Sequence, residues 1–202
     1  QPLSVAALVG SAAGIATSIV ASAAGVAPLA APGDIELAGF AVLPAETFGP
    51  GPPSGQYGDD GRRAPAPRFA AQPVQGLSAL LPGPRPGTWW GLSDNGYALR
   101  ANSPDFRLVI HLFDARPDRR EVRVLQRIEL RDPAHHLPWR LAEENLPGRP
   151  LTGADVDPES FVAMPDGSFW VGDEIGPWLL HFGADGTLLA PPAELPADAA
   201  GA

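Results

Sequence analysis

Five carboxylates bracket a predicted pair of strands in one short part of the chain, between Leu151 and Phe182. They are Asp155, Asp157, Glu159, Asp173 and Glu174. Two short apolar runs lie between these acids, and a Pro-Asp-Gly sequence at positions 165–167 joins the runs. A turn of this kind between β-branched and aromatic residues predicts a β-hairpin. Because a hairpin returns to the end at which it began, the acids on its two sides are expected to meet on one rim.

Carboxylates on one rim repel each other unless a cation or an arginine lies between them. Calcium and similar hard divalent ions favour a surrounding of oxygen atoms. We therefore predict a metal site, with calcium as the ion, that includes Asp157, Glu159, Asp173 and Glu174. The alternative interpretation is that these residues are the solvated acids of ordinary turns.

A weak internal repeat adds Asp94 to the predicted metal ligands. Residues 75–96 and 159–176 share a pattern of a polar residue, an apolar strand, a turn, a Trp-bearing strand and then an acid. Asp94 in the first copy corresponds to Asp173 in the second. The spacing of about 80 residues predicts roughly two propeller blades of about 40 residues each. The alternative interpretation is that Asp94 is part of an ordinary turn around Asn95-Gly96, because turns favour these residues.

The predicted catalytic residues are Glu159, Glu174 and Arg107. The two glutamates would act on a water molecule or hold the ion, and a guanidinium would orient a phosphate by bidentate hydrogen bonds. Arg100 and Arg140 are further candidates for the phosphate-binding arginine. A serine nucleophile is not predicted, because the chain has no G-x-S-x-G sequence and neither Ser93 nor Ser160 has an evident His partner.

The elements that would position these residues are short strands. The chain has 25 Pro and 23 Gly, which is too many for a helical protein and typical of an all-β fold. Strands are predicted at 35–43, 76–81, 88–93, 107–114, 121–130, 161–164, 168–171, 178–182 and 187–189. Residues 47–72 are expected to form a loop, and residues 132–153 a long polar insert.

Three blocks of sequence resemble the phytase-like family called "esterase-like activity of phytase", which are secreted bacterial β-propeller proteins. The blocks span residues 73–106, 122–145 and 151–182 with the tail that follows, and the likeness covers about residues 35–195. The family's GDE(F/Y)GP run stands here as GDEIGP, with Ile175 in place of the aromatic residue. The resemblance implies a β-propeller-like fold, of which residues 32–202 would be a truncated N-terminal part. It also implies calcium-linked phosphoester chemistry.

Three functions remain open on these observations. The first is a calcium-dependent hydrolase of small-molecule phosphoesters. The second is a non-catalytic propeller module in which the acids hold structural calcium. The third is a lactonase or carboxylesterase that uses water activated by a metal. The sequence does not distinguish the first from the third, and it leaves the oligomeric state open.

Charge and composition exclude other classes of protein. The net charge of −9 argues against nucleic acid as a partner, because a phosphate backbone requires a basic face. It also means that a polyphosphorylated substrate would need bridging cations or a local group of arginines. The absence of Cys excludes disulfides, thiolate nucleophiles and zinc sites built from Cys.

An uncharged run from Leu3 to Val26 predicts a secretory signal peptide over residues 1–31 whose basic first part is missing. The small residues Ala21-Ser22-Ala23 form a suitable cleavage sequence, with Ala-rich alternatives up to Ala31. The run is nearly long enough for an uncleaved membrane anchor, but its many Ala, Gly and Ser residues argue against a stable span. Export to the periplasm or beyond is therefore expected.

Overall fold

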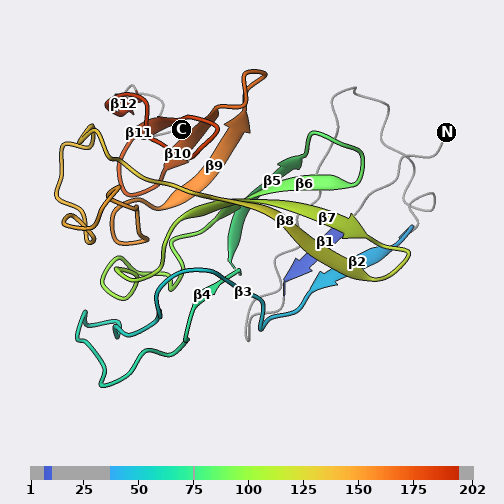
Figure 1. Ribbon diagram of the computed structural model, residues 1–202, viewed down its shortest axis with the longest axis horizontal. Coiled ribbons are helices and arrows are strands. Elements are labelled where there is room, and N and C mark those ends of the chain that lie inside the picture. Colours follow the sequence, from blue (N-terminus) through green and yellow to red (C-terminus); the bar gives the residue numbers. More distant parts are fainter. Residues whose placement is uncertain (1–6, 11–36, 75, 196–202) are drawn as a thin grey trace.

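The computed structural model describes residues 7–10, 37–74 and 76–195, and these fold as an all-β structure in which no helix occurs. Two sheets, one mixed and one antiparallel, make up most of it, and Figure 1 shows them side by side. The predicted fold class is confirmed: the structure has the form of a partial β-propeller.

The first sheet is curled and has six strands. Its order is β1-β2-β8-β7-β6-β5. The bounds are β1 Ala7–Gly10, β2 Phe40–Leu43, β5 Leu77–Pro82, β6 Thr88–Ser93, β7 Val109–Arg116 and β8 Glu121–Glu129. Strands β5 to β8 form an antiparallel meander in sequence order. The short strands β1 and β2 extend this sheet in parallel, and β2 joins β8 through the single pair Val42 and Glu121.

The second sheet has four strands in the order β12-β11-β10-β9. These are β9 Pro158–Ala163, β10 Phe169–Asp173, β11 Trp178–Phe182 and β12 Ala193–Glu194. The predicted hairpin is confirmed as β9 and β10, which pair in antiparallel register. At its turn Gly167 has a φ of 86°, a left-handed conformation that suits glycine, and the carboxylate of Asp166 accepts the backbone N–H of Ser168 at 2.9 Å.

The two sheets pack against each other through a shared core. Each contains a four-stranded antiparallel meander, and β5 and β6 lie against β9. One hydrophobic core runs through both sheets, and in it the rings of Trp90 and Phe169 meet edge to face at 5.2 Å. The sequence repeat therefore corresponds to β5–β6 and β9–β10 in neighbouring sheets. The two copies of the repeat are therefore separated by one blade and the insert, whereas their spacing of about 80 residues predicted two blades.

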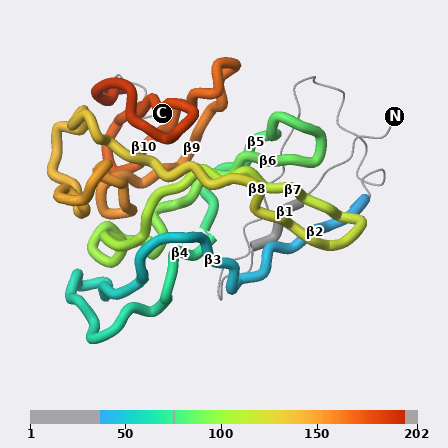
Figure 2. Tube along the Cα trace, in the orientation of Figure 1, coloured from blue at the N-terminus to red at the C-terminus, as the bar shows by residue number. Residues whose placement is uncertain are grey.

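The insert between β8 and β9 contributes apolar side chains to the core, whereas its composition predicted a polar insert. Leu137, Leu141 and Leu151 are buried in the shared core, and Trp139 packs against Trp178 with ring centroids 5.9 Å apart. Figure 2 shows this segment in gold beside the second sheet. A buried ion pair between Asp132 and Arg149, at 3.1 Å, closes the base of the insert. The insert is thus a folded part of the domain.

Two other segments differ from the prediction. Within residues 47–72, strand β3 (Phe48–Gly49) pairs with β4 (Gln72–Pro73) to make a short ribbon. The predicted strand at 187–189 forms only isolated bridges, because Thr187 and Leu188 pair with Arg131 and Phe182 singly.

Of the predicted signal segment, the structure describes only the four residues of β1, and the remainder of 1–31 lies outside the described residues. Residues 35 and 36 of the first predicted strand also lie outside them. Across the described ranges, no helix is long and apolar enough to cross a membrane.

Candidate metal centre

Three of the predicted ligands come together where the two sheets meet. Asp94 directly follows β6, Asp157 directly precedes β9, and Glu159 is the second residue of β9. Each offers one carboxylate oxygen, and these oxygens all lie within 4.8 Å of one another. We call Asp94, Asp157 and Glu159 the acid cluster. Its members come from both sheets: Asp94 from the end of β6, and Asp157 and Glu159 from the start of β9.

Asn95 joins the two halves of the acid cluster. Its side-chain amide donates to Asp157 Oδ2 at 2.8 Å, and its Oδ1 accepts the backbone N–H of Ala98 at 2.8 Å. Its own backbone N–H donates to Asp94 Oδ1 at 2.6 Å. The side chain is buried, with 5% exposed. The sequence identified Asn95 only as a turn residue. An Asn that follows an acid at a strand end was the one available indication of this second role.

A glycine allows the segment before β9 to approach the loop after β6. A Cβ atom at Gly153 would overlap the backbone carbonyl of Asn95, so no other residue fits there without movement of the backbone. The Gly153 N–H donates to the carbonyl of Phe106 at 2.9 Å, which fixes the segment to the loop before β7. This close approach sets the position of Asp157 relative to Asp94.

Asp173 lies next to the acid cluster and organises the backbone around it. Its Oδ1 accepts the N–H groups of Asp157 at 2.8 Å and Ile175 at 3.2 Å, and its Oδ2 accepts that of Gly176 at 3.2 Å. Both oxygens are thus engaged by main-chain donors. The structure gives Asp173 a role in holding Asp157 in place, whereas its predicted role as a metal ligand stays a prediction.

Glu174 is a second carboxylate, besides Asp173, close to the acid cluster. Its backbone N–H donates to the carbonyl of Asp157 at 2.9 Å. Its side chain is exposed, and it interacts with Glu159 closely enough to raise the pKa of that residue. Glu174 therefore stands at the solvent side of the cluster.

The electrostatics of the cluster favour a bound cation. Burial, followed by the charges of Asp94, Asp157 and Glu174, raises the pKa of Glu159 to about 7. Burial also raises the pKa of Asp94, and Asp157 and Glu174 add to the effect. Asp157 Oδ1 is buried and has no hydrogen-bond partner among the described residues. An all-oxygen donor set with an unpaired buried oxygen fits a hard divalent ion such as calcium.

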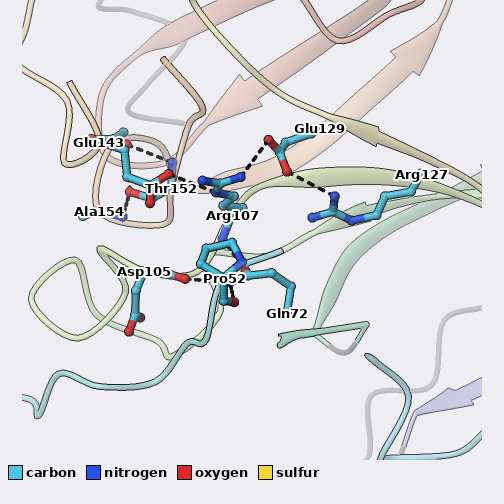
Figure 3. A network of polar contacts seen from close by, with 10 residues as sticks. Pro52, Gln72, Asp105, Arg107, Arg127, Glu129, Glu143, Thr152 and Ala154 are labelled. Carbon is cyan, nitrogen blue, oxygen red and sulfur yellow. Dashed lines mark hydrogen bonds and ion pairs between the residues drawn. The ribbon is translucent and has the colours of Figure 1, made fainter. Parts of the chain in front are cut away.

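Arg107 is engaged away from the acid cluster. Its Nε donates to Glu143 Oε2 at 2.9 Å, and its Nη1 lies 3.2 Å from Glu129 Oε1. Figure 3 shows the guanidinium between these two carboxylates. No contact between Arg107 and the acid cluster occurs in the described part of the chain. Its predicted role in orienting phosphate stays a prediction, and the structure explains it as the centre of an ion-pair network.

Arg100 is the arginine that the structure places beside the site segment. It is exposed, and its Nε donates to the carbonyl of Ala154 at 2.9 Å, three residues before Asp157. Arg140 is exposed within the insert. Of the three arginines that the sequence singled out, Arg100 is the one that contacts the segment leading to Asp157.

Asp155, the remaining acid of the segment, is a structural residue. It is buried with 3% exposed, and its Oδ2 accepts both the N–H and the hydroxyl of Thr152, at 2.8 and 2.7 Å. Its Oδ1 accepts the N–H of Ala142 at 2.7 Å. Asp155 thus ties the insert to the segment that carries Asp157. Burial is the main cause of its raised pKa.

A Ser–His contact that the sequence did not reveal lies on the second sheet. His181 Nε2 is 3.0 Å from Ser168 Oγ, and its ring stacks on Trp170 at 4.3 Å. The hydroxyl of Ser168 donates to Asp166 Oδ1 at 2.7 Å, and Ser168 is 5% exposed. In a catalytic Ser-His pair the serine hydroxyl donates its hydrogen bond to the histidine. The hydroxyl of Ser168 instead donates to Asp166, in its own turn. The contact braces the β9–β10 turn.

Comparison with known proteins identifies one family. The model of the phytase-like family, described as "esterase-like activity of phytase", matches residues 72–201. The match includes every residue of the acid cluster. No curated protein and no solved structure matches the chain.

Proposed function

The chain belongs to the phytase-like family, and we propose that it hydrolyses phosphoesters of small molecules with the help of a divalent cation, calcium. The observation that carries this proposal is the acid cluster, in which oxygens of Asp94, Asp157 and Glu159 lie within 4.8 Å of one another. Asp157 supports it further, because one of its oxygens is buried and lacks a hydrogen-bond partner among the described residues.

The residues divide the work by their positions. Asp94 and Asp157 would hold the ion from the two sheets, and Glu159 would complete the set from β9. A cation held there would neutralise the substrate's negative charge and make water a better nucleophile. Glu174, at the exposed side next to Glu159, accepts a proton from the attacking water. Arg100, anchored on the carbonyl of Ala154, orients the phosphate.

The test is hydrolysis of 4-nitrophenyl phosphate, bis(4-nitrophenyl) phosphate and phytate, each with calcium and with a chelator. We expect phosphate or nitrophenol release that requires calcium and falls at least about 100-fold in Glu159→Gln. Glu46→Gln, an exposed glutamate outside the cluster, is the matched control and should keep full activity. Activity that survives both the chelator and Glu159→Gln contradicts the proposal.

A second candidate, hydrolysis of carboxyl esters or lactones at the same centre, is favoured by one observation. Arg107 is held by Glu129 and Glu143, so the site has fewer arginines for a phosphate dianion than the sequence predicted. The assay above therefore includes 4-nitrophenyl acetate and a simple lactone. Calcium-dependent cleavage of these alone assigns the centre to carboxyl esters, and calcium binding without any turnover assigns it to a structural ion in a binding module.

Export is the remaining part of the proposal, and the uncharged run Leu3–Val26 supports it. A calcium site open to solvent is typical of modules that work where calcium is abundant, outside the cytoplasm. Fractionation of cells that express the protein tests this, and retention in the cytoplasm contradicts it.

A further inference from the structure

One asparagine of this chain stands in a sequence that is chemically unstable. Asn95 is followed directly by Gly96. The other asparagines, Asn102 and Asn145, precede residues that carry side chains. In an Asn-Gly pair no side chain shields the backbone nitrogen of the glycine from the amide carbon of the asparagine, and asparagine is a thermolabile residue. Asn95 is therefore the amide that an unfolded chain is expected to lose first.

The fold requires both residues of this unstable pair. Gly96 has a φ of 100°, and a Cβ atom there would overlap the ring of Phe106, so a larger residue does not fit without rearrangement. Asn95 is required as a donor, because its side-chain amide bonds the carboxylate of Asp157 just before β9. Replacing either residue by a more stable one would therefore cost a contact beside the acid cluster.

In the folded chain, both polar atoms of the Asn95 side chain are held. Its Nδ2 donates to Asp157 Oδ2 at 2.8 Å, its Oδ1 accepts the N–H of Ala98 at 2.8 Å, and only 5% of the residue is exposed. Deamidation requires the amide group to turn until its carbon meets the backbone nitrogen of Gly96, and both hydrogen bonds resist this rotation. The N–H of Gly96 itself makes no hydrogen bond within the described residues. The side-chain contacts of Asn95 therefore supply the protection.

These contacts persist only while the segment before β9 lies against the loop after β6. Asp157 supplies the acceptor, and Gly153 lies so close that a Cβ atom on it would overlap the carbonyl of Asn95. Arg100 adds a hydrogen bond to the carbonyl of Ala154 at 2.9 Å. The carboxylates of the acid cluster repel one another at the same place. Opening of this contact should therefore cost less free energy than unfolding of the core.

We propose that Asn95 is a site of deamidation, which the closed contact between the two sheets prevents and which its opening permits. The backbone nitrogen of Gly96 bonds to the amide carbon of Asn95, the bond from that carbon to Nδ2 breaks, and ammonia leaves with the proton of the attacking nitrogen. Water then opens the cyclic imide at either carbonyl and gives aspartate or isoaspartate. Neither carboxylate can donate to Asp157, and each adds a negative charge beside it, so the opening becomes permanent. This inference does not depend on the proposed hydrolase activity.

The test is peptide mapping by mass spectrometry of the protein incubated at pH 8, both folded and unfolded in guanidinium chloride. In the unfolded protein Asn95 should convert first, and in the folded protein its conversion should be at least about tenfold slower. Asn145 is exposed but precedes a leucine, so it should stay intact in both samples and serves as the internal control. Equal rates at Asn95 in the two samples, or faster conversion of another asparagine in the unfolded protein, overturn the proposal.

Two variants test which contact protects the amide. Asp157→Ala removes the acceptor of Nδ2, and Gly153→Ala forces the neighbouring segment away from Asn95. Each should accelerate deamidation of Asn95 in the folded protein at least about threefold. Asp118→Ala removes an exposed acid between β7 and β8, far from this contact in sequence, and should leave the rate unchanged. A rate that is unchanged in both Asp157→Ala and Gly153→Ala overturns the proposal.

The permanence of the opening is tested on the product. Asn95→Asp carries the carboxylate that deamidation creates, and the amides of β9 in this variant should exchange their hydrogens at least about threefold faster than in the wild type. Asn145→Asp places the same charge on an exposed residue and should exchange as the wild type does. Wild-type exchange of β9 in Asn95→Asp would show that the modified chain closes again, against the proposal.

Discussion

Replacing Glu159 with glutamine should stabilise the protein when calcium is absent and remove its response when calcium is present. The first effect follows from the pKa of Glu159, which burial and the neighbouring acids raise from 4.5 to about 7. The folded chain therefore holds the proton more tightly than the unfolded chain does. The stability gained from protonation is complete below pH 4.5 and is lost as the pH rises to about 7.

The magnitude follows from the same two values. A difference of about 2.5 between them corresponds to about 3 kcal/mol for a fully shielded group. Glu159 is largely exposed, and screening by solvent reduces this to about 1 kcal/mol. At pH 7.5 in a chelator, Glu159→Gln should therefore unfold about 2–4 °C above the wild type. At pH 4 the two proteins should unfold at nearly the same temperature, because Glu159 is then protonated.

Calcium should reverse the order. An ion that binds only the folded chain stabilises it in proportion to its affinity, and Glu159→Gln removes one of the three proposed ligands. Thermal unfolding at pH 7.5, with calcium and with chelator, measures both effects. Glu46→Gln should follow the wild type throughout, since it lies outside the cluster. A variant that is less stable than the wild type in chelator at pH 7.5, or that keeps the full calcium response, would refute the reasoning.

Four further outcomes are expected. Asp132→Asn should lower the free energy of unfolding by about 2–4 kcal/mol in denaturant titrations, because it removes the buried one of the two carboxylates that pair with Arg149 and leaves only Glu144. Asp118→Asn on the surface should cost less than about 1 kcal/mol. Gly153→Ala should both destabilise the fold and weaken the calcium response, because its Cβ would overlap the carbonyl of Asn95, and an unchanged calcium response would contradict this position for the loop. Burial lowers the pKa of His111 to about 3, so the stability that its neutral ring contributes is lost as the pH falls from 6.5 towards 3. The NMR signals of the ring should therefore not shift between pH 5 and 8. A titration midpoint near 6.5 would show that the ring is not buried. Ser168→Ala should retain hydrolysis within about threefold, whereas a loss of about 1,000-fold would indicate a serine esterase.

The sequence predicted the strands well where their pattern was local. The hairpin of β9 and β10 follows from a turn sequence between two apolar runs, and β6 and β11 occupy their predicted ranges. The insert could not be predicted, because its burial depends on Leu137 and Leu141 reaching a core formed by residues far away in the chain. The cost of burying its polar residues is offset by the pair of Asp132 and Arg149, which no local pattern reveals.

The candidate site was predicted in its composition but not in its division of roles. Asp94, Asp157 and Glu159 lie together, although the repeat related Asp94 to Asp173, which is not a member of the group. Asp173 has the same residue type and a similar position in sequence, yet its oxygens accept main-chain N–H groups. Whether a carboxylate faces an ion or a backbone amide depends on the loop conformation after the strand. The ion pairs of Arg107 could not be predicted from local sequence either, because its partners Glu129 and Glu143 lie 22 and 36 residues away.

The acid cluster takes its members from two sheets, and this makes it a joint as well as a site. In the described structure, side-chain hydrogen bonds from Asn95 to Asp157 and from Arg100 to the carbonyl of Ala154 span this joint beside three carboxylates that repel one another. A cation there would act as a removable clamp between blades, so its concentration would set how cooperatively the two sheets unfold. With the clamp in place the blades should melt as one unit, and without it the second sheet should exchange its amide hydrogens before the first.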